Sequence, residues 1–301
     1  MIAVAPGIGA TIYGHLPRDV TAEVVSAADF VCLHTLADAT DITTAAQVRR
    51  MGCARVWLAT PANYLVRTMD RHGEGAAIVE AKRAARIALD AGCEVFEFNG
   101  EGSSDGKAPG DWIPADAAEA SRLARLAAEA IEAARDVLGT RCAVAWTSHD
   151  MPGFKLPWRA ILERVDLHAP QHYPAEAGRQ VPQRELAARI ARSQGRWEEL
   201  AHRGEIPADA APYGARWSPY LQGWGHTPGA LVWGLCEAAT ARLWAYPGSW
   251  SAAAVPALRA ARALRSVAGY GPDAVERWQA AHGLDADGAV GPRTLAALVA
   301  A

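Results

Sequence analysis

Short apolar runs alternate with alanine-rich helical segments through about the first 248 residues of this 301-residue chain. Eight runs have the length and composition of buried strands: residues 2–4, 30–34, 55–59, 94–98, 142–146, 166–169, 211–213 and 230–235. The clearest helical segments are residues 75–91, 114–138 and 182–203. Strands that alternate with helices favour a parallel sheet covered by helices, and eight such units favour a closed barrel.

The boundaries of the helical segments support this interpretation. Pro114 and Asp116 open one segment with an early proline and a first-turn acid, and glycines frame the segment 75–91. A dinucleotide-binding fold is the weaker alternative, because residues 7–12 lack the third glycine of G-x-G-x-x-G. We therefore predict that residues 1–248 form an α/β fold, a (β/α)8 TIM-like barrel whose sixth to eighth units are less regular.

The last thirty residues indicate a helix, a tight turn and a second helix. Asp287-Gly288 is a turn pair, because glycine tolerates positive φ and aspartate bonds its own backbone. Pro292 suits the first turn of a helix, where its missing N–H has no intrahelical partner. Residues 255–264 carry a further apolar stripe at helical spacing. Residues 252–301 are thus expected to form a small all-α domain of three helices.

This tail resembles the repeat of the peptidoglycan-binding domain found on many cell-wall hydrolases. That family has the pattern V-x-x-F-Q-x-x-x-G-L-x-x-D-G-x-x-G-x-x-T-x-x-x-L, which residues 275–298 match with Trp278 in the phenylalanine position. The connection at residues 269–272 is shorter than the family's. The resemblance implies that peptidoglycan or a related glycan is the partner. A three-helix appendage that binds nothing is the alternative.

Charge and hydropathy argue against two other kinds of partner. The formal net charge is -3, whereas a nucleic-acid footprint needs clustered lysine and arginine. No apolar run approaches the roughly 18 residues of a transmembrane helix, so we expect no membrane insertion. The N-terminus lacks the positive start of a signal peptide. Five cysteines without close pairs indicate free thiols and synthesis in the cytoplasm. We expect action at the cell wall after release or delivery.

The fourth predicted strand carries the richest set of polar residues. Strand alternation places Glu97, Asn99 and Glu101 on one face and Phe96 and Phe98 on the other. With the aromatic rings against the helices, the polar side chains line the mouth of the barrel. Chemistry in such barrels is found at the C-terminal ends of the strands. This strand end is therefore the first candidate for an active site.

Acids and aromatic residues also follow the fifth, sixth and eighth predicted strands. Glycoside hydrolysis needs an acid that protonates the leaving oxygen and a second group that attacks or activates water. We expect Glu101 to be the general acid and Asp150 or Glu237 to be its partner. The residues expected to bind substrate are Glu97, Asn99, His172, Tyr173, Trp146 and Trp233. Each also admits a structural interpretation: core packing for the tryptophans, a cap or loop contact for the polar residues.

A barrel followed by a wall-binding tail resembles the Chalaropsis-type muramidases and related barrel endolysins. Those enzymes carry an Asp-x-Glu pair on the fourth strand, and the matching positions here are Asn99 and Glu101. They also carry an aspartate on the first strand, and residues 2–12 contain none. The resemblance implies a cell-wall glycan hydrolase, of phage or prophage origin. The alternative is a non-catalytic barrel that binds the wall or belongs to a phage-like particle.

Metal, cofactor and serine-hydrolase chemistry have weaker support. No H-E-x-x-H motif or Cys/His quartet occurs, and His168 and His172 lie in a strand and loop rather than on one helical face. Residues 148–150 read Ser-His-Asp, but neighbours along a strand point in opposite directions, and a triad usually comes from separate elements. We therefore expect neither a metal nor a cofactor.

Overall fold

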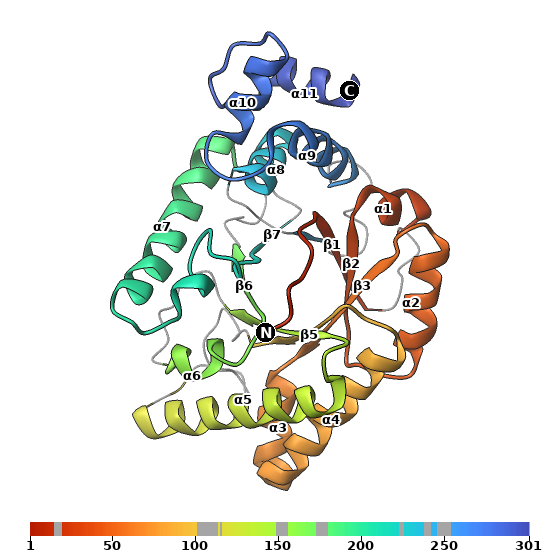
Figure 1. The fold of residues 1–301 in the computed structure, drawn as a ribbon, viewed down its shortest axis with the longest axis vertical. Coiled ribbons are helices and arrows are strands. Elements are labelled where there is room, and N and C mark those ends of the chain that lie inside the picture. Colours follow the sequence, from red (N-terminus) through yellow and green to blue (C-terminus); the bar gives the residue numbers. More distant parts are fainter. Residues whose placement is uncertain are drawn as a thin grey trace.

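The computed structural model describes residues 1–14, 20–100, 114, 116–148, 156–172, 180–222, 226–237, 242–245 and 254–300. Eight parallel strands close into a barrel in sequence order, with the first strand paired to the last (Figure 1). The predicted fold class is confirmed. The strands are β1 (Gly9–Tyr13), β2 (Phe30–His34), β3 (Arg55–Pro61), β4 (Val95–Asn99), β5 (Ala143–Ser148), β6 (Leu167–His172), β7 (Tyr220–Gln222) and β8 (Arg242–Ala245).

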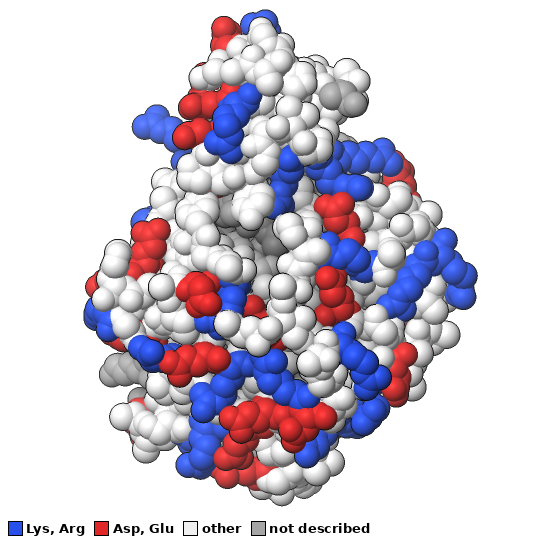
Figure 2. Space-filling model, in the orientation of Figure 1, with Lys and Arg blue, Asp and Glu red and all other residues white. Residues whose placement is uncertain are grey.

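Helices surround the barrel and continue into the C-terminal tail (Figure 1). They are α1 (Ala22–Ala27), α2 (Thr40–Arg50), α3 (Asn63–His72), α4 (Glu74–Asp90), α5 (Ala117–Leu138), α6 (Trp158–Leu162), α7 (Gln183–His202), α8 (Pro228–Cys236), α9 (Val255–Ala268), α10 (Ala274–Ala281) and α11 (Pro292–Ala300), with a 3-10 turn at Ala208–Ala210. No helix among the described residues is both long enough and apolar enough to cross a membrane. Figure 2 shows acidic and basic side chains interspersed over one face of the molecule.

Three of the predicted strands are wrong. Residues 2–4 precede the barrel as an extended segment, and the first strand is β1, which begins at Gly9. A side chain on Gly9 would meet the Phe30 ring at 2.2 Å, so glycine at this position makes room for that ring inside the barrel. Residues 211–213 lie in a turn, and the seventh strand is β7.

The third error concerns residues 230–235, which belong to α8. Thr227 caps this helix by accepting a hydrogen bond from the Ala230 N–H at 3.2 Å, and Pro228 occupies its first turn. The helix packs between α7 and α9 and against β7, with α10 also in contact, so nearly all of its residues are buried. A helix that is apolar on every side cannot be told from a buried strand by periodicity alone.

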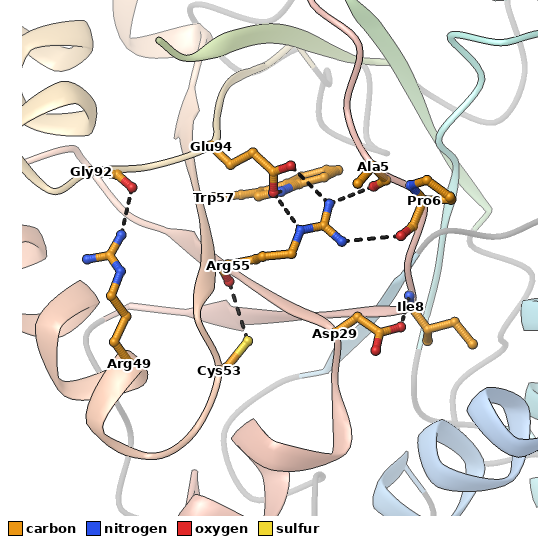
Figure 3. Close-up of polar contacts among 10 residues, drawn as sticks. All are labelled: Ala5, Pro6, Ile8, Asp29, Arg49, Cys53, Arg55, Trp57, Gly92 and Glu94. Atoms are coloured by element: carbon orange, nitrogen blue, oxygen red, sulfur yellow. Dashed lines mark hydrogen bonds and ion pairs between the residues drawn. The ribbon is translucent and has the colours of Figure 1, made fainter. Parts of the chain in front are cut away.

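An extended N-terminal segment, residues 1–8, crosses the end of the barrel where the strands begin (Figure 3). The guanidinium of Arg55 donates to the backbone carbonyls of Ala5 at 2.6 Å and Pro6 at 3.2 Å. The Glu94 carboxylate accepts from the same guanidinium at 2.8 Å. Arg55 therefore joins the segment to β3 and fixes its path across the barrel.

The tail is organised around one buried amide, that of Gln279 on α10. Its Nε2 lies 2.9 Å from Asp287 Oδ1, 3.0 Å from the Ala289 carbonyl and 3.1 Å from Thr294 Oγ1. Its Oε1 accepts from the Gly288 N–H at 3.0 Å. The motif residues Gln, Asp-Gly and Thr thus hold the turn between α10 and α11 in place.

The tail packs directly on the barrel. The Gln183 side chain at the start of α7 donates to the Gly288 carbonyl at 2.8 Å and accepts from the Val290 N–H at 2.9 Å. A side chain on Gly229 would meet the Val290 carbonyl oxygen at 2.1 Å, so glycine permits this close approach. We predicted that residues 1–248 and 252–301 form two domains. Helix α9 packs both on the barrel helices α1 and α8 and on the tail helices α10 and α11, so this division stays a prediction.

Candidate active site

The inward face of β4 carries the predicted polar residues. Glu97 and Asn99 point into the barrel, while Phe96 and Phe98 belong to the core between the barrel and the helices. The alternation predicted for this strand is confirmed. Both polar side chains are buried, with 2% of Glu97 and 4% of Asn99 exposed.

An ion pair crosses the interior of the barrel from β4 to β8. The Arg242 guanidinium donates to Glu97 Oε2 at 2.5 Å, and Thr147 Oγ1 donates to Glu97 Oε1 at 2.6 Å. The guanidinium also lies over the rings of Trp57 and Tyr220, at 5.2 and 4.6 Å from their centroids. Burial is the largest single effect and lowers the pKa of Arg242, but Glu97, Cys32 and Tyr220 together raise it by more, so the net shift is upward.

A chain of polar side chains lies nearer the C-terminal ends of the strands. Gln171 Nε2 donates to Asn99 Oδ1 at 3.2 Å and to the Tyr220 hydroxyl. Asn99 Nδ2 lies 3.1 Å from His34 Nε2. Burial, with a smaller contribution from Arg242, lowers the pKa of His34 to about 4. His34 is therefore neutral at pH 7, and its Nε2 accepts the Asn99 amide proton.

A pocket of about 250 Å³ opens beside this chain at the C-terminal end of the barrel. The residues that line it are His34, Leu36, Pro61, Asn63, Tyr64, Arg67 and Asn99. His34, Pro61 and Asn99 are the last residues of β2, β3 and β4, and Tyr64 is 43% exposed at the start of α3. Hydrogen-bonding groups beside an exposed ring, with the Arg67 guanidinium in the same lining, suit a polar ligand such as a sugar.

The structure describes only some of the residues that were predicted to catalyse the reaction or bind substrate. Glu101, Asp150 and Tyr173 lie outside the described residues. The register pairs Asn99 with Thr147 on the adjacent strands β4 and β5. In the sequence, Glu101 follows Asn99 by two residues and Asp150 follows Thr147 by three.

Glu237 lies elsewhere. It follows α8, which returns from the C-terminal end of β7 to the N-terminal end of β8. Its Oε1 accepts a hydrogen bond from the Val275 N–H at 2.6 Å, which satisfies the first turn of α10. Burial raises the pKa of Glu237, against the hydrogen bonds that lower it. The prediction that Glu237 ends a strand is wrong, and the structure does not bring it to the pocket.

Three other predicted substrate-binding residues also lie away from the pocket. Trp146 is fully buried on the helix-facing side of β5, 6.0 Å from the Phe98 ring between centroids. His172 is buried on the helix-facing side of β6 beside Trp217, and burial lowers its pKa to about 3. Trp233 lies within α8, half-buried against the main core.

The sequence interpretation missed four residues of the polar chain and ion pair: His34, Gln171, Tyr220 and Arg242. Alternation along β6 could have placed Gln171 inward, since it neighbours the predicted His172. His34 ends a strand that was predicted with the observed bounds. Arg242 and Tyr220 lie on strands that were assigned to the wrong residues. Within the described part of the chain, no cluster of three His, Cys, Asp or Glu side chains could hold a metal ion.

Residues 272–298 match the family model described as a putative peptidoglycan binding domain. No curated protein matches the chain as a whole. The matched segment contains the buried Gln279 network, so the features that identify the family are those that hold the tail's turn in place.

Solved structures show the same barrel fold. A family 18 chitinase from Pseudoalteromonas aurantia gives a TM-score of 0.52 at 8% identity, covering 84% of this chain and 99% of that one. The family 18 chitinase ChiB from Flavobacterium johnsoniae gives 0.51 at 8% identity, covering 84% and 93%. The family 26 domain of a mannanase/glucanase from Prevotella bryantii gives 0.51 at 11%, covering 86% and 89%. The barrel therefore has the fold of glycoside hydrolases.

Replacing Arg242 by methionine should destabilise the protein strongly. The change leaves the Glu97 carboxylate buried without its cation, which typically costs about 3–5 kcal/mol. The double variant Glu97→Gln/Arg242→Met should recover much of this loss, because it removes the uncompensated charge. Urea denaturation of the three proteins measures the difference, with Arg203→Met, whose pair with Glu199 is exposed, as a control near zero. Equal stability of the single and double variants would contradict the assignment.

Acid should destabilise the fold through its buried histidines. Burial lowers the pKa of His34, His168 and His226 to about 4 and that of His172 to about 3. Each has an unfolded value near 6.5, so below that pH the unfolded chain binds more protons. The free energy of unfolding then falls by up to about 1.4 kcal/mol for each histidine and each pH unit, until the pH reaches the pKa of that histidine in the folded state.

Melting temperatures measured from pH 7 to pH 4.5 test this expectation. His172→Leu should flatten the pH dependence, since neither ring nitrogen of His172 has a hydrogen-bond partner among the described residues. His202→Leu, an exposed change on α7, should leave the slope as in the wild type. A melting temperature that stays constant over this range would refute the assignment.

Proposed function

We propose that this protein is a cell-wall glycan hydrolase whose barrel cleaves the glycan that its tail binds. The observation that carries the proposal is the polar pocket at the C-terminal end of the barrel, in a chain whose residues 272–298 match the peptidoglycan-binding family model. Enzymes with this fold place their chemistry at that end. A pocket of about 250 Å³ is of the size that holds one sugar ring.

Glu101 is the proposed general acid. It follows the inward-facing Asn99, the last residue of β4, by two residues in the sequence. It would protonate the glycosidic oxygen as the bond to the leaving sugar breaks.

Asp150 is the proposed second carboxylate, because β4 and β5 are adjacent and their ends are in register. The distance between the two carboxyl groups decides the stereochemistry. About 5–5.5 Å would lead to retention through a covalent intermediate, and roughly 6.5–9.5 Å to inversion by an activated water. The Asn99 amide and Tyr173 are the proposed contacts to the sugar hydroxyls.

We further propose that the protein is an endolysin, made in the cytoplasm and delivered to the wall. All five cysteines are free and buried, as is typical of chains that fold in a reducing compartment. Burial raises the pKa of four of these thiols to about 12, so they stay protonated and unreactive: Cys32, Cys93, Cys142 and Cys236.

A second candidate function is a non-catalytic barrel that binds the wall or forms part of a phage-like particle. One observation favours it: the described lining of the pocket contains no carboxylate. Asn99 stands where the muramidases that the chain resembles carry an aspartate. The nearby Glu97 carboxylate is paired with Arg242. Such a barrel would bind peptidoglycan through the tail and release no sugar. Hydrolytic activity therefore separates the two candidates.

Glu101→Gln tests the catalytic assignment. The amide keeps the size of the side chain but carries no transferable proton, so turnover on peptidoglycan should fall about 10²–10⁴-fold. Sedimentation with insoluble peptidoglycan and the melting temperature should match the wild type, because the tail and core are unchanged. Glu129→Gln, an exposed change on α5, is the matched control and should keep full turnover. Unchanged turnover in a folded Glu101→Gln protein would remove Glu101 from the mechanism.

A further inference from the structure

A second cleft lies at the N-terminal end of the barrel, opposite the candidate active site. It consists of two adjoining cavities of about 300 and 680 Å³. The residues common to both are Pro6, Gly7, Arg265 and Tyr270. The N-terminal segment forms one wall, and Arg55 fixes that segment in place (Figure 3). The cleft is thus a fixed feature of the fold.

Arg265 is a half-buried cation that forms no ion pair with a carboxylate among the described residues, although the Asp29 carboxylate raises its pKa against the larger effect of burial. Its guanidinium lies 4.6 Å from the centroid of the Tyr270 ring and 3.5 Å from the Gly7 carbonyl oxygen, and burial lowers its pKa. Each other half-buried arginine in the described ranges has a carboxylate partner, except Arg49, which donates to two backbone carbonyls at 2.8 and 2.6 Å. An anion beside Arg265 would offset the cost of this partial burial.

The acids near Arg265 already have partners. Asp29 pairs with Arg262 at 2.9 Å and accepts a hydrogen bond from the Ile8 N–H at 2.8 Å. Glu23 pairs with Arg259 at 3.2 Å. Figure 2 shows basic side chains gathered over α9, the helix that carries these arginines. The described walls of the cleft therefore attract an anion.

Exposed aromatic rings complete the cleft. Tyr270 is 53% and Tyr213 46% exposed, and both line the smaller cavity. Tyr213 has a φ of 61°, a conformation that bulky residues rarely adopt, and such strain clusters at binding sites. The neighbouring turn is tightly fixed, because a side chain on Gly214 would meet the Asp209 carbonyl oxygen at 2.4 Å. Flat aromatic faces beside a guanidinium suit a sugar ring that carries a carboxylate.

The cleft lies where the tail joins the barrel. The Gly271 N–H donates to the Cys236 carbonyl at 2.8 Å, directly after Tyr270 and before the matched peptidoglycan-binding segment. Glu237 accepts from the Val275 N–H at the same junction. A ligand held in the cleft would therefore lie beside the start of the wall-binding domain.

We propose that this cleft binds a muramic acid residue of the wall glycan from which the stem peptide has been removed, so that its lactyl carboxylate is free. Arg265 pairs with the carboxylate, and the rings of Tyr270 and Tyr213 pack against the sugar. The proposal rests on the proposed function only in taking the wall glycan as ligand, and binding at this cleft needs no hydrolysis. It gives the barrel a wall contact separate from the candidate active site.

The test compares two sugars by calorimetry on the full-length protein: N-acetylmuramic acid and N-acetylglucosamine, which share a ring and differ by the lactyl carboxylate. The wild type should bind N-acetylmuramic acid at least tenfold more tightly. Arg265→Gln should abolish this preference, and Tyr270→Ala should weaken binding of both sugars. Arg259→Gln, an exposed change on the same helix, should keep the preference.

Glu101→Gln should also keep the preference, which separates this cleft from the candidate active site. If Arg265→Gln does not fold, Tyr270→Ala, which removes a half-exposed ring, carries the test. Equal affinity for the two sugars, or an unchanged preference in folded Arg265→Gln, would overturn the proposal. Binding of an acidic stem peptide at Arg265 without the sugar would overturn it too. Selective binding without any hydrolysis would leave it standing while refuting the proposed function.

Discussion

The ion pair between Glu97 and Arg242 is the constraint on which the interior of the barrel depends. Two opposite charges are buried between β4 and β8, and each offsets the cost of removing the other from water. Thr147 donates a hydrogen bond to the second oxygen of the Glu97 carboxylate, and the rings of Trp57 and Tyr220 lie against the Arg242 guanidinium. The same cation helps to keep His34 neutral. The polar character of the pocket at the C-terminal end thus follows from a pair buried beneath it.

The sequence predicted the regular part of the fold because its signals are local. In β4, aromatic and polar residues alternate without interruption, and in the tail Gln279 bonds partners 8 to 15 residues away. In β1 and β8, by contrast, the local sequence was misleading. Gly9 looks like a loop residue until the Phe30 ring that fills its space is known, and Arg242 looks like a surface residue until Glu97 is placed opposite. The apolar run in α8 carried no period that could separate helix from strand.

The candidate site was predictable only as far as one strand. Asn99 follows from alternation, but its partners His34 and Gln171 lie 65 and 72 residues away in the sequence. Glu237 was placed at a strand end because α8 was taken for a strand, whereas its carboxylate holds α10 at the other end of the barrel. The C-terminal end of the barrel thus carries the pocket proposed for catalysis, and the N-terminal end carries the basic cleft. The tail packs along the outside, on the starts of α7 and α8 and on the end of α8.

The central claim is that a barrel with this pocket cleaves the glycan its tail binds. The most direct measurement is the release of new reducing ends from purified, insoluble peptidoglycan by the full-length protein, with the soluble products identified by mass spectrometry. The account predicts reducing ends that increase with time and products one or a few disaccharides long. Protein that sediments with peptidoglycan but releases no reducing ends would contradict it and would favour the non-catalytic barrel.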